Sequence, residues 1–215
     1  MRGIGGHPEK YVDIAYLDWY YTQTGKKREM LIDDWHPTWL RDLPEMAHLR
    51  APGNTCLSAC ESLFRGEKTQ NNSKGCGGIM RVAPMALLNA GYASRNENGY
   101  SIEELAEAGG EIAEVTHKHP LGFLPASLLT VLLYKIVPMS PKQVCEEIDG
   151  IVADTVSILD SIYKGKYKSD KQYLKELTNL AVQLAHSNIS DADAIRQLGE
   201  GWVAEETWAI ALYCA

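Results

Sequence analysis

The sequence predicts an all-α protein, a single compact multi-helix bundle, and three observations support this. Apolar residues recur at helical spacing in segment after segment, whereas no β-branched alternation persists beyond four residues. Helix start and stop signals separate these segments. The length of 215 residues suits one domain, and neither an internal repeat nor a linker interrupts it. We therefore expect residues 1–215 to form one domain.

Two helices are expected in the first third of the chain. Pro8 suits a first helical position, and apolar and aromatic residues then recur at helical spacing up to Gly25. A loop rich in Trp, His and Pro follows as far as Pro52. The next helix is predicted from Thr55 to Phe64, with Gly66 as its stop signal.

The central part is expected to combine a glycine-rich loop with two helices. Residues 70–78 are polar and rich in glycine, and an apolar run follows at 85–88. Ser101 and Glu104 form a capping-box pattern that opens a helix. Pro120 is expected to end that helix, and a buried helix is predicted over about 123–136.

The C-terminal part continues in the same style. Ser140 and Pro141 form a start signal, and the helix they open is expected to run to Gly165. A further helix is predicted over about 170–185, followed by a short capped turn at 190–193. The last helix is expected from Ala204 to Cys214.

Composition and charge narrow the class of protein. The 21 Lys and Arg residues against 28 Asp and Glu residues give a net charge of −7, which argues against sequence-independent nucleic-acid binding. The apolar stretch 121–139 contains Pro125, Lys135 and Pro138, so no membrane span is expected. The N-terminus has no signal-peptide pattern. Five cysteines without a C-x-x-C pair are expected to be small buried thiols, which favours a cytoplasmic protein.

Three loops next to helices carry the residues of chemical interest. They are 71–81, with three glycines in four residues, 116–122, with His117 and His119, and 199–206, a G-x-G-W segment followed by two glutamates. Glycines let a backbone approach a ligand closely, and backbone N–H groups can hold phosphate. Each loop alone also has an ordinary explanation: a connector, a hydrogen-bonded histidine pair, and a turn with Trp as a core anchor. No G-K-[ST] occurs, so the first loop is not a Walker loop.

The order of these motifs is more specific than any one of them. It runs P-G-N-T from Pro52, S-K-G-C-G-G-I-M-R-V-A-P from Ser73, T-H-x-x-P-x-G from Thr116, and G-x-G-W-V-A-E-E from Gly199. This order resembles the ADP-ribosylglycohydrolase family over essentially the whole chain. The resemblance implies an all-α bundle that binds ADP-ribose, or an ADP-ribosylated acceptor, between loops. It also implies two magnesium ions that assist cleavage of the glycosidic bond at the ribose C1″.

The same resemblance implies roles for individual residues. The pyrophosphate and ribose would be lined by Ser73, Lys74, Gly75, Cys76, Gly77 and Gly78. The remaining contacts would come from His117 near the phosphates or ribose, Gly53 through its backbone, and Gly201 and Trp202 beside the adenosine. Cys76 replaces a common Asn and so removes an amide contact, while Arg81 is expected to brace the loop from behind.

The magnesium ligands of the family have no counterpart that we can assign. Its T-D-D-T motif does not occur, and Asp33-Asp34 stands in the wrong order and context. Asp191 and Asp193 look like a D-x-D motif, but they precede the G-x-G-W segment and are expected to belong to an N-capping turn. Glu205 and Glu206 are expected to be solvated residues of a helix start. No metal ligand and no catalytic residue is therefore assigned, although Mg²⁺ is expected for the family.

We expect a chain truncated at both ends relative to the family and inactive by itself. The alternative is a non-catalytic module that binds ADP-ribose or another nucleotide, or that serves a structural role. A third possibility is an unrelated all-α scaffold whose glycine-rich loops are connectors.

Overall fold

A computed structural model describes residues 6–26 and 39–215. Within these ranges the chain forms nine α-helices, short 3-10 turns and no β-strand, which confirms the all-α fold class. The helices are α1 (Pro8–Thr24), α2 (Asn54–Phe64), α3 (Ala83–Ser94), α4 (Ile102–Glu114), α5 (Pro120–Ile136), α6 (Pro141–Ser157), α7 (Lys168–Ala185), α8 (Asp191–Leu198) and α9 (Ala204–Tyr213). The division into one domain stays a prediction.

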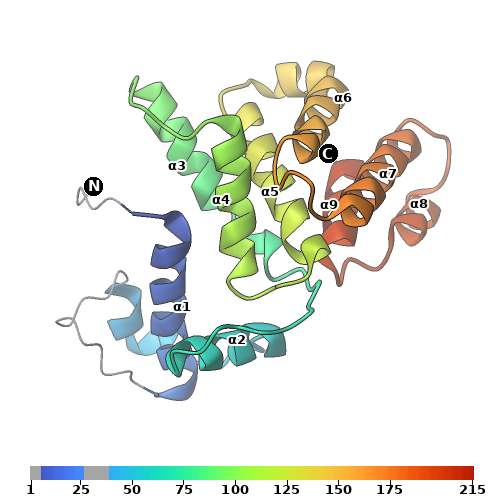
Figure 1. The fold of residues 1–215 in the computed structure, drawn as a ribbon. Coiled ribbons are helices and arrows are strands. Elements are labelled where there is room, and N and C mark those ends of the chain that lie inside the picture. The colour runs from blue at the N-terminus through green and yellow to red at the C-terminus, as the bar shows by residue number, and fades with distance from the viewer. Residues whose placement is uncertain (1–5, 27–38) are drawn as a thin grey trace.

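Helix α5 is the centre of the bundle (Figure 1). It packs along α4 and also contacts α3, α6, α7 and α9. Apolar residues are buried around most of its circumference, and Phe123, Leu124 and Leu128 are at most 1% exposed. A helix that is apolar all round is expected in a core. No helix in the described ranges is long and apolar enough to cross a membrane.

Two groups of helices lie on either side of this centre (Figure 1). On one side, α1 packs on α2 and touches α4. On the other side, α7, α8 and α9 enclose a smaller apolar core of their own. Trp208 of α9 belongs to the main core instead, and its indole N–H donates a hydrogen bond of 2.9 Å to the hydroxyl of Thr178 on α7. This packing fixes the first turn of α9 beside the glycine-rich loop.

Two helix boundaries differ from the sequence-based expectation. Pro120 does not merely end the preceding helix; it is the first residue of α5, with His119 as the N-cap. Proline is tolerated there because the first helical N–H has no partner within the helix. Helix α6 ends at Ser157 rather than at Gly165, and a 3-10 turn over Ile158–Asp160 follows.

The capping signals themselves are confirmed. Both Ser101 and Ser140 make complete capping boxes with the residue three positions on. The expected turn at 190–193 is the start of α8, and the Ser190 hydroxyl accepts from the Asp193 N–H. Local hydrogen bonding of this kind is readable from sequence because it involves neighbours three residues apart.

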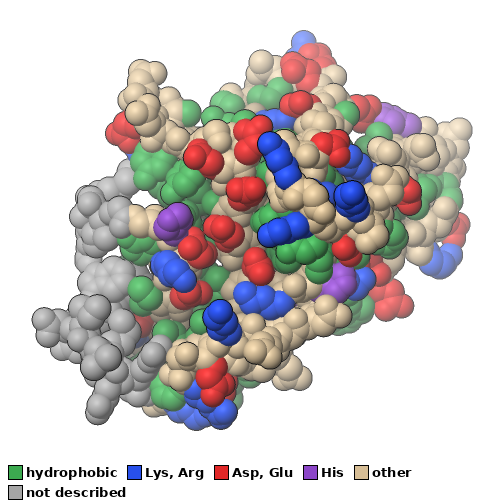
Figure 2. All heavy atoms as spheres, viewed as in Figure 1, with side chains coloured by type: hydrophobic (Ala, Val, Ile, Leu, Met, Phe, Trp, Pro, Cys, Tyr) green, Lys and Arg blue, Asp and Glu red, His purple; other side chains and the backbone are tan. Residues whose placement is uncertain are grey.

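The described surface carries mixed charges and two exposed cysteines. Acidic and basic side chains are interspersed on the face in Figure 2, without one large basic patch. All five cysteines are free, but only Cys60 is buried, so the expectation of buried thiols is wrong for Cys145 and Cys214, which are exposed. Burial raises the pKa of the Cys60 thiol to about 12, with the nearby Cys56 as a second cause.

Candidate functional site

One asparagine joins the glycine-rich loop to the histidine loop. The Asn71 side-chain N–H donates to the Thr116 carbonyl at 2.9 Å. Its side-chain oxygen accepts from the Ser73 and Lys118 backbone N–H groups, both at 3.1 Å. The half-buried Asn71 amide therefore helps to fix the two loops against each other, together with a hydrogen bond of 3.4 Å from the His119 N–H to the Ser73 carbonyl.

The glycine-rich loop is also joined to the G-x-G-W loop by an isolated antiparallel bridge. The Cys76 N–H donates to the Trp202 carbonyl at 3.1 Å, and the Ala204 N–H donates to the Lys74 carbonyl at 2.7 Å. The bridge pairs Gly75 with a residue 128 positions further along the chain, Val203. All three loops singled out in the sequence thus meet at one place.

The start of α2 completes this meeting point. The hydroxyl of Thr55, in the first turn of α2, lies 3.2 Å from the Ser73 hydroxyl. The Ser73 hydroxyl also accepts from the Gly75 N–H at 3.2 Å. Gly53 is the exposed N-cap of α2, and a Cβ added to it would meet nothing within 4 Å. Gly53 therefore lies at the edge of the site and leaves space beside its backbone.

Close backbone approach explains several glycines of the site. A Cβ on Gly75 or Gly77 would lie 3.1 Å from the imidazole ring of His117. A Cβ on Gly122 would lie 2.7 Å from the Ser73 carbonyl oxygen, and one on Gly78 would lie 3.1 Å from the Gly122 carbonyl oxygen. The loop is packed directly on the His117 ring and on the first turn of α5, and only glycine leaves the room for this.

His117 is buried beneath the loop and neutral. Its Nδ1 lies 2.7 Å from the Thr116 hydroxyl and 3.4 Å from an Arg81 nitrogen. Burial, and then the positive charge of Arg81, lower the pKa of His117 to about 4. At neutral pH the ring therefore offers one donor and one acceptor rather than a charge.

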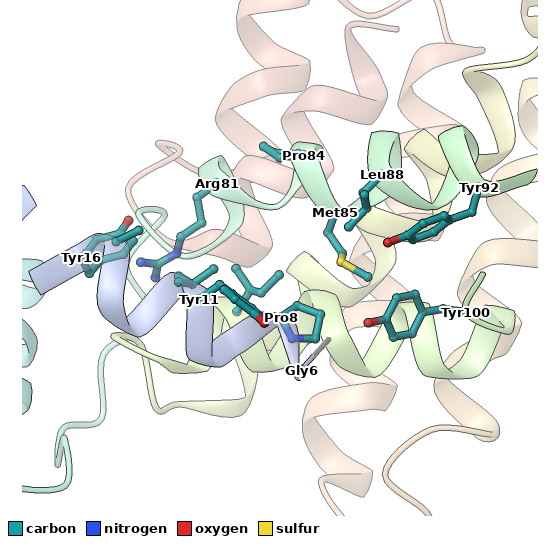
Figure 3. Close-up of a pocket in the computed structure, with 13 residues that line it drawn as sticks. Gly6, Pro8, Tyr11, Tyr16, Arg81, Pro84, Met85, Leu88, Tyr92 and Tyr100 are labelled. Atoms are coloured by element: carbon teal, nitrogen blue, oxygen red, sulfur yellow. The ribbon is translucent and has the colours of Figure 1, made fainter. Parts of the chain in front are cut away.

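Arg81 acts from behind the loop, as expected for a brace. Its guanidinium donates to the Ala113 carbonyl at 3.2 Å and to the Thr116 hydroxyl. The same guanidinium lies 4.6 Å from the ring centroid of Tyr16 on α1. It lines a cavity of about 480 Å³ whose walls come mainly from α1 and α3, and Figure 3 shows Arg81 beside Tyr16 at one end of it. Arg81 thus ties the α1 side of the molecule to the site.

The two glutamates of the last loop make contacts within the fold, and the expectation of a solvated residue is wrong for Glu205. Glu205 is 1% exposed and forms an ion pair with Lys74 across the bridge. Glu206 accepts from the backbone N–H groups of Glu200 at 3.1 Å and Gly201 at 3.0 Å. Gly201 has φ 77°, a left-handed conformation that glycine adopts without strain. Both carboxylates hold the loops in place.

Trp202 is not a core anchor. Its side chain is 75% exposed, while its backbone carbonyl is fixed in the bridge. An exposed indole on a fixed backbone offers a flat aromatic surface beside the glycine-rich loop. This position agrees with the role that the sequence motif implies, although contact with a ligand stays a prediction.

The described residues do not fit a magnesium centre. In ranges 6–26 and 39–215, no group of three or more His, Cys, Asp or Glu side chains is placed to hold a metal ion. Asp193 forms an ion pair with Arg196, and Asp191 accepts from the Tyr213 hydroxyl at 2.7 Å, so both belong to the capped start of α8. Asp33 and Asp34 lie outside the described residues.

Sequence reasoning missed three contributors to the site. These are the Asn71 amide, the Thr55 hydroxyl and the Thr116 hydroxyl. Asn71 carried a usable signal, because an Asn two residues before a serine often bonds that backbone N–H in an Asx turn. The two threonines stand in the P-G-N-T and T-H-x-x-P-x-G motifs, but their contacts with Ser73 and Arg81 were not predictable because these partners come from distant segments.

Comparison with known proteins identifies the family of this chain. The ADP-ribosylglycohydrolase family model matches residues 2–215. The ADP-ribosylhydrolase ARH3 of Homo sapiens is 24% identical over 164 residues, which cover 72% of this chain and 42% of that protein. The same-named protein of Bos taurus gives the same figures, and that of Mus musculus is 24% identical with 41% of its length covered.

The chain therefore spans about two fifths of the length of these curated relatives. No solved structure matches it. The family match covers nearly all of the chain and includes the loops that the structure brings together. The chain belongs to the ADP-ribosylglycohydrolase family.

Proposed function

We propose that this chain binds ADP-ribose, or the ADP-ribose part of a modified acceptor, on the face where its three loops meet. The observation that carries the proposal is the glycine-rich loop held between His117 and the G-x-G-W loop. Within the described part of the chain, the backbone N–H groups of Lys74 and Gly77 make no hydrogen bond. Unpaired amides in a tight glycine loop are suited to phosphate oxygens.

The predicted contacts follow the chemistry of the ligand. The pyrophosphate is expected on the loop from Ser73 to Gly78, with His117 beneath it. The adenine ring is expected against the exposed indole of Trp202, because aromatic side chains stack with bases. Gly201 and Gly53 would contribute backbone contacts at the two edges of the site. Cys76 is expected to contribute its backbone rather than its thiol.

We further propose that this chain alone does not cleave the glycosidic bond. The family is generally metal-dependent, and Mg²⁺ requires oxygen ligands. Near the loop, Glu205 is paired with Lys74 and Glu206 with backbone N–H groups. A non-catalytic binding or structural module is the second candidate function, favoured by this structural use of both carboxylates. We also propose a reducing compartment such as the cytoplasm for this chain, because its five cysteines are free thiols.

Isothermal titration with ADP-ribose tests the binding proposal. We expect a 1:1 complex whose affinity is the same with and without Mg²⁺. Gly77→Ala would place a methyl group 3.1 Å from the His117 ring, so its affinity should fall at least about tenfold, or 1.4 kcal/mol. Gly150→Ala is the matched control, since a Cβ there meets nothing within 4 Å. Absence of binding by the unmodified chain would contradict the proposal.

A release assay tests the proposed absence of cleavage by this chain alone. The chain is incubated with an ADP-ribosylated acceptor and Mg²⁺, and free ADP-ribose is measured. We expect no release above the uncatalysed rate. Turnover by the chain alone would show that it holds a complete catalytic centre and would remove the non-catalytic alternative.

A further inference from the structure

Two polar groups, the Thr116 hydroxyl and the Arg81 guanidinium, meet at one nitrogen of the buried His117 ring. The Thr116 hydroxyl oxygen lies 2.7 Å from His117 Nδ1. One nitrogen of the Arg81 guanidinium contacts that hydroxyl and lies 3.4 Å from the same Nδ1. Thr116 is fully buried, and His117 is 2% exposed, so water has little access to this contact.

The donor inventory, together with the Arg81 N–H groups facing Nδ1, favours one assignment of protons. A guanidinium only donates, so the Thr116 oxygen must accept from Arg81. The single hydroxyl proton of Thr116 is then free to donate to His117 Nδ1, which must be unprotonated to accept it. A proton on Nδ1 would also face the Arg81 N–H groups, donor against donor. In a neutral imidazole the proton therefore resides on Nε2.

The opposite edge of the ring faces the glycine-rich loop. A Cβ on Gly75 would lie 3.1 Å from His117 Nε2, and one on Gly77 would lie 3.4 Å from it. Within the described residues, Nε2 makes no hydrogen bond. This N–H donor therefore lies at the loop without a protein acceptor.

We propose that Arg81 and Thr116 are positioning residues that hold His117 as the Nε2–H tautomer, so that it donates to a ligand oxygen on the glycine-rich loop. The last step rests on the proposed ADP-ribose site. The arrangement selects an acceptor, such as a phosphate or hydroxyl oxygen, at this point of the ligand. A ligand group that offers only N–H donors there would be rejected, because two donors would face each other.

The tautomer is measured directly in the ligand-free chain by long-range ¹H–¹⁵N correlation of histidine side chains. The His117 signals are identified by their loss in His117→Gln. We expect an unprotonated Nδ1 and a protonated Nε2 in the unmodified chain. Thr116→Val keeps the side-chain shape but removes the hydroxyl, so it should produce a mixture of the two tautomers. Arg81→Lys keeps the positive charge but removes the planar guanidinium with its several N–H donors, so it should also increase the share of the Nδ1–H tautomer.

Titration with ADP-ribose supplies the second measurement. Thr116→Val is expected to weaken binding about fivefold, the equivalent of one hydrogen bond of about 1 kcal/mol. Thr155→Val is the matched control, because Thr155 is also fully buried but its hydroxyl makes no hydrogen bond. The control should leave the tautomer and the affinity unchanged.

The two measurements fail independently. An Nδ1–H tautomer in the unmodified chain, or an unchanged tautomer in Thr116→Val, would overturn the positioning role whatever the titration gives. An equal loss of affinity in Thr116→Val and Thr155→Val would overturn it as well, since the effect would then be general packing. Absence of ADP-ribose binding by the unmodified chain would instead overturn the proposed function.

Discussion

The two sides of the glycine-rich loop use their polar groups differently. On one side, His117 is buried and neutral, and its Nε2 faces the loop without a protein partner. On the other side, the Glu205 carboxylate pairs with Lys74, and the Glu206 carboxylate accepts from backbone N–H groups. One side thus presents a hydrogen-bonding group to a ligand, whereas the other side stabilises the loop itself. Each of the two acids near the site therefore makes a structural contact, whereas Oε2 of Glu205 has no hydrogen-bond partner among the described residues.

The largest expected effect comes from breaking the His117 side through backbone packing. Gly122→Val would place a Cβ 2.7 Å from the Ser73 carbonyl oxygen, which cannot move without moving the loop. We expect the free energy of unfolding to fall by more than about 3 kcal/mol, measured by chemical denaturation. Gly150→Val is the control and should change it by less than about 0.5 kcal/mol, because its Cβ meets open space. Equal effects would show that the loop is not packed as described.

Acid should weaken the same side through His117. Its pKa is about 4 in the folded chain against 6.5 for the unperturbed side chain, so the unfolded state binds more protons between these values. This contribution is complete above pH 6.5 and is lost as the pH falls toward 4, by up to about 3 kcal/mol. Urea titrations across this range measure it. The dependence of the unfolding free energy on pH should become weaker in His117→Gln. An unchanged dependence in that variant would assign the loss to other groups.

The Lys74–Glu205 pair tests the opposite side. Lys74→Met would leave the buried Glu205 carboxylate without its partner and should cost about 2 kcal/mol of unfolding free energy. Adding Glu205→Gln should recover part of this loss, because the unpaired charge is removed. The control is Lys142→Met in a pair exposed at both ends, with an expected change under about 0.5 kcal/mol. Additive losses in the double variant would argue against a coupled pair.

The smallest change in stability is expected at Trp202. Since its side chain is 75% exposed, Trp202→Ala should change the unfolding free energy by less than about 0.5 kcal/mol. Its ADP-ribose affinity should nevertheless fall about tenfold if the indole stacks on adenine, within the 1–3 kcal/mol per base seen on alanine substitution. Trp208→Ala, at a 1% exposed position, should show the reverse balance with a large loss of stability. Unchanged affinity in Trp202→Ala would remove the stacking role.

Sequence reasoning reached much of the fold and the location of the site. Ser101 and Ser140 marked helix starts that the structure confirms, and the three motif-bearing loops do meet. It misjudged the end of α6, because the apolar spacing continues through Ile162 although the backbone has already left the helix. It also misjudged Glu205, because a glutamate in a first helical turn is normally solvated.

The sequence by itself determined the helix class, the caps and the order of the loops. These depend on interactions between residues three or four positions apart, which leave a periodic trace in the chain. Only the tertiary structure decided that Glu205 pairs with Lys74, 131 positions away, and that Thr116 and Arg81 meet at one nitrogen of His117. Such contacts depend on how α4, α5 and α9 pack, and burial at this place then lowers the pKa of His117. The motifs predict where the site lies, and the tertiary packing determines which contacts each side chain makes there.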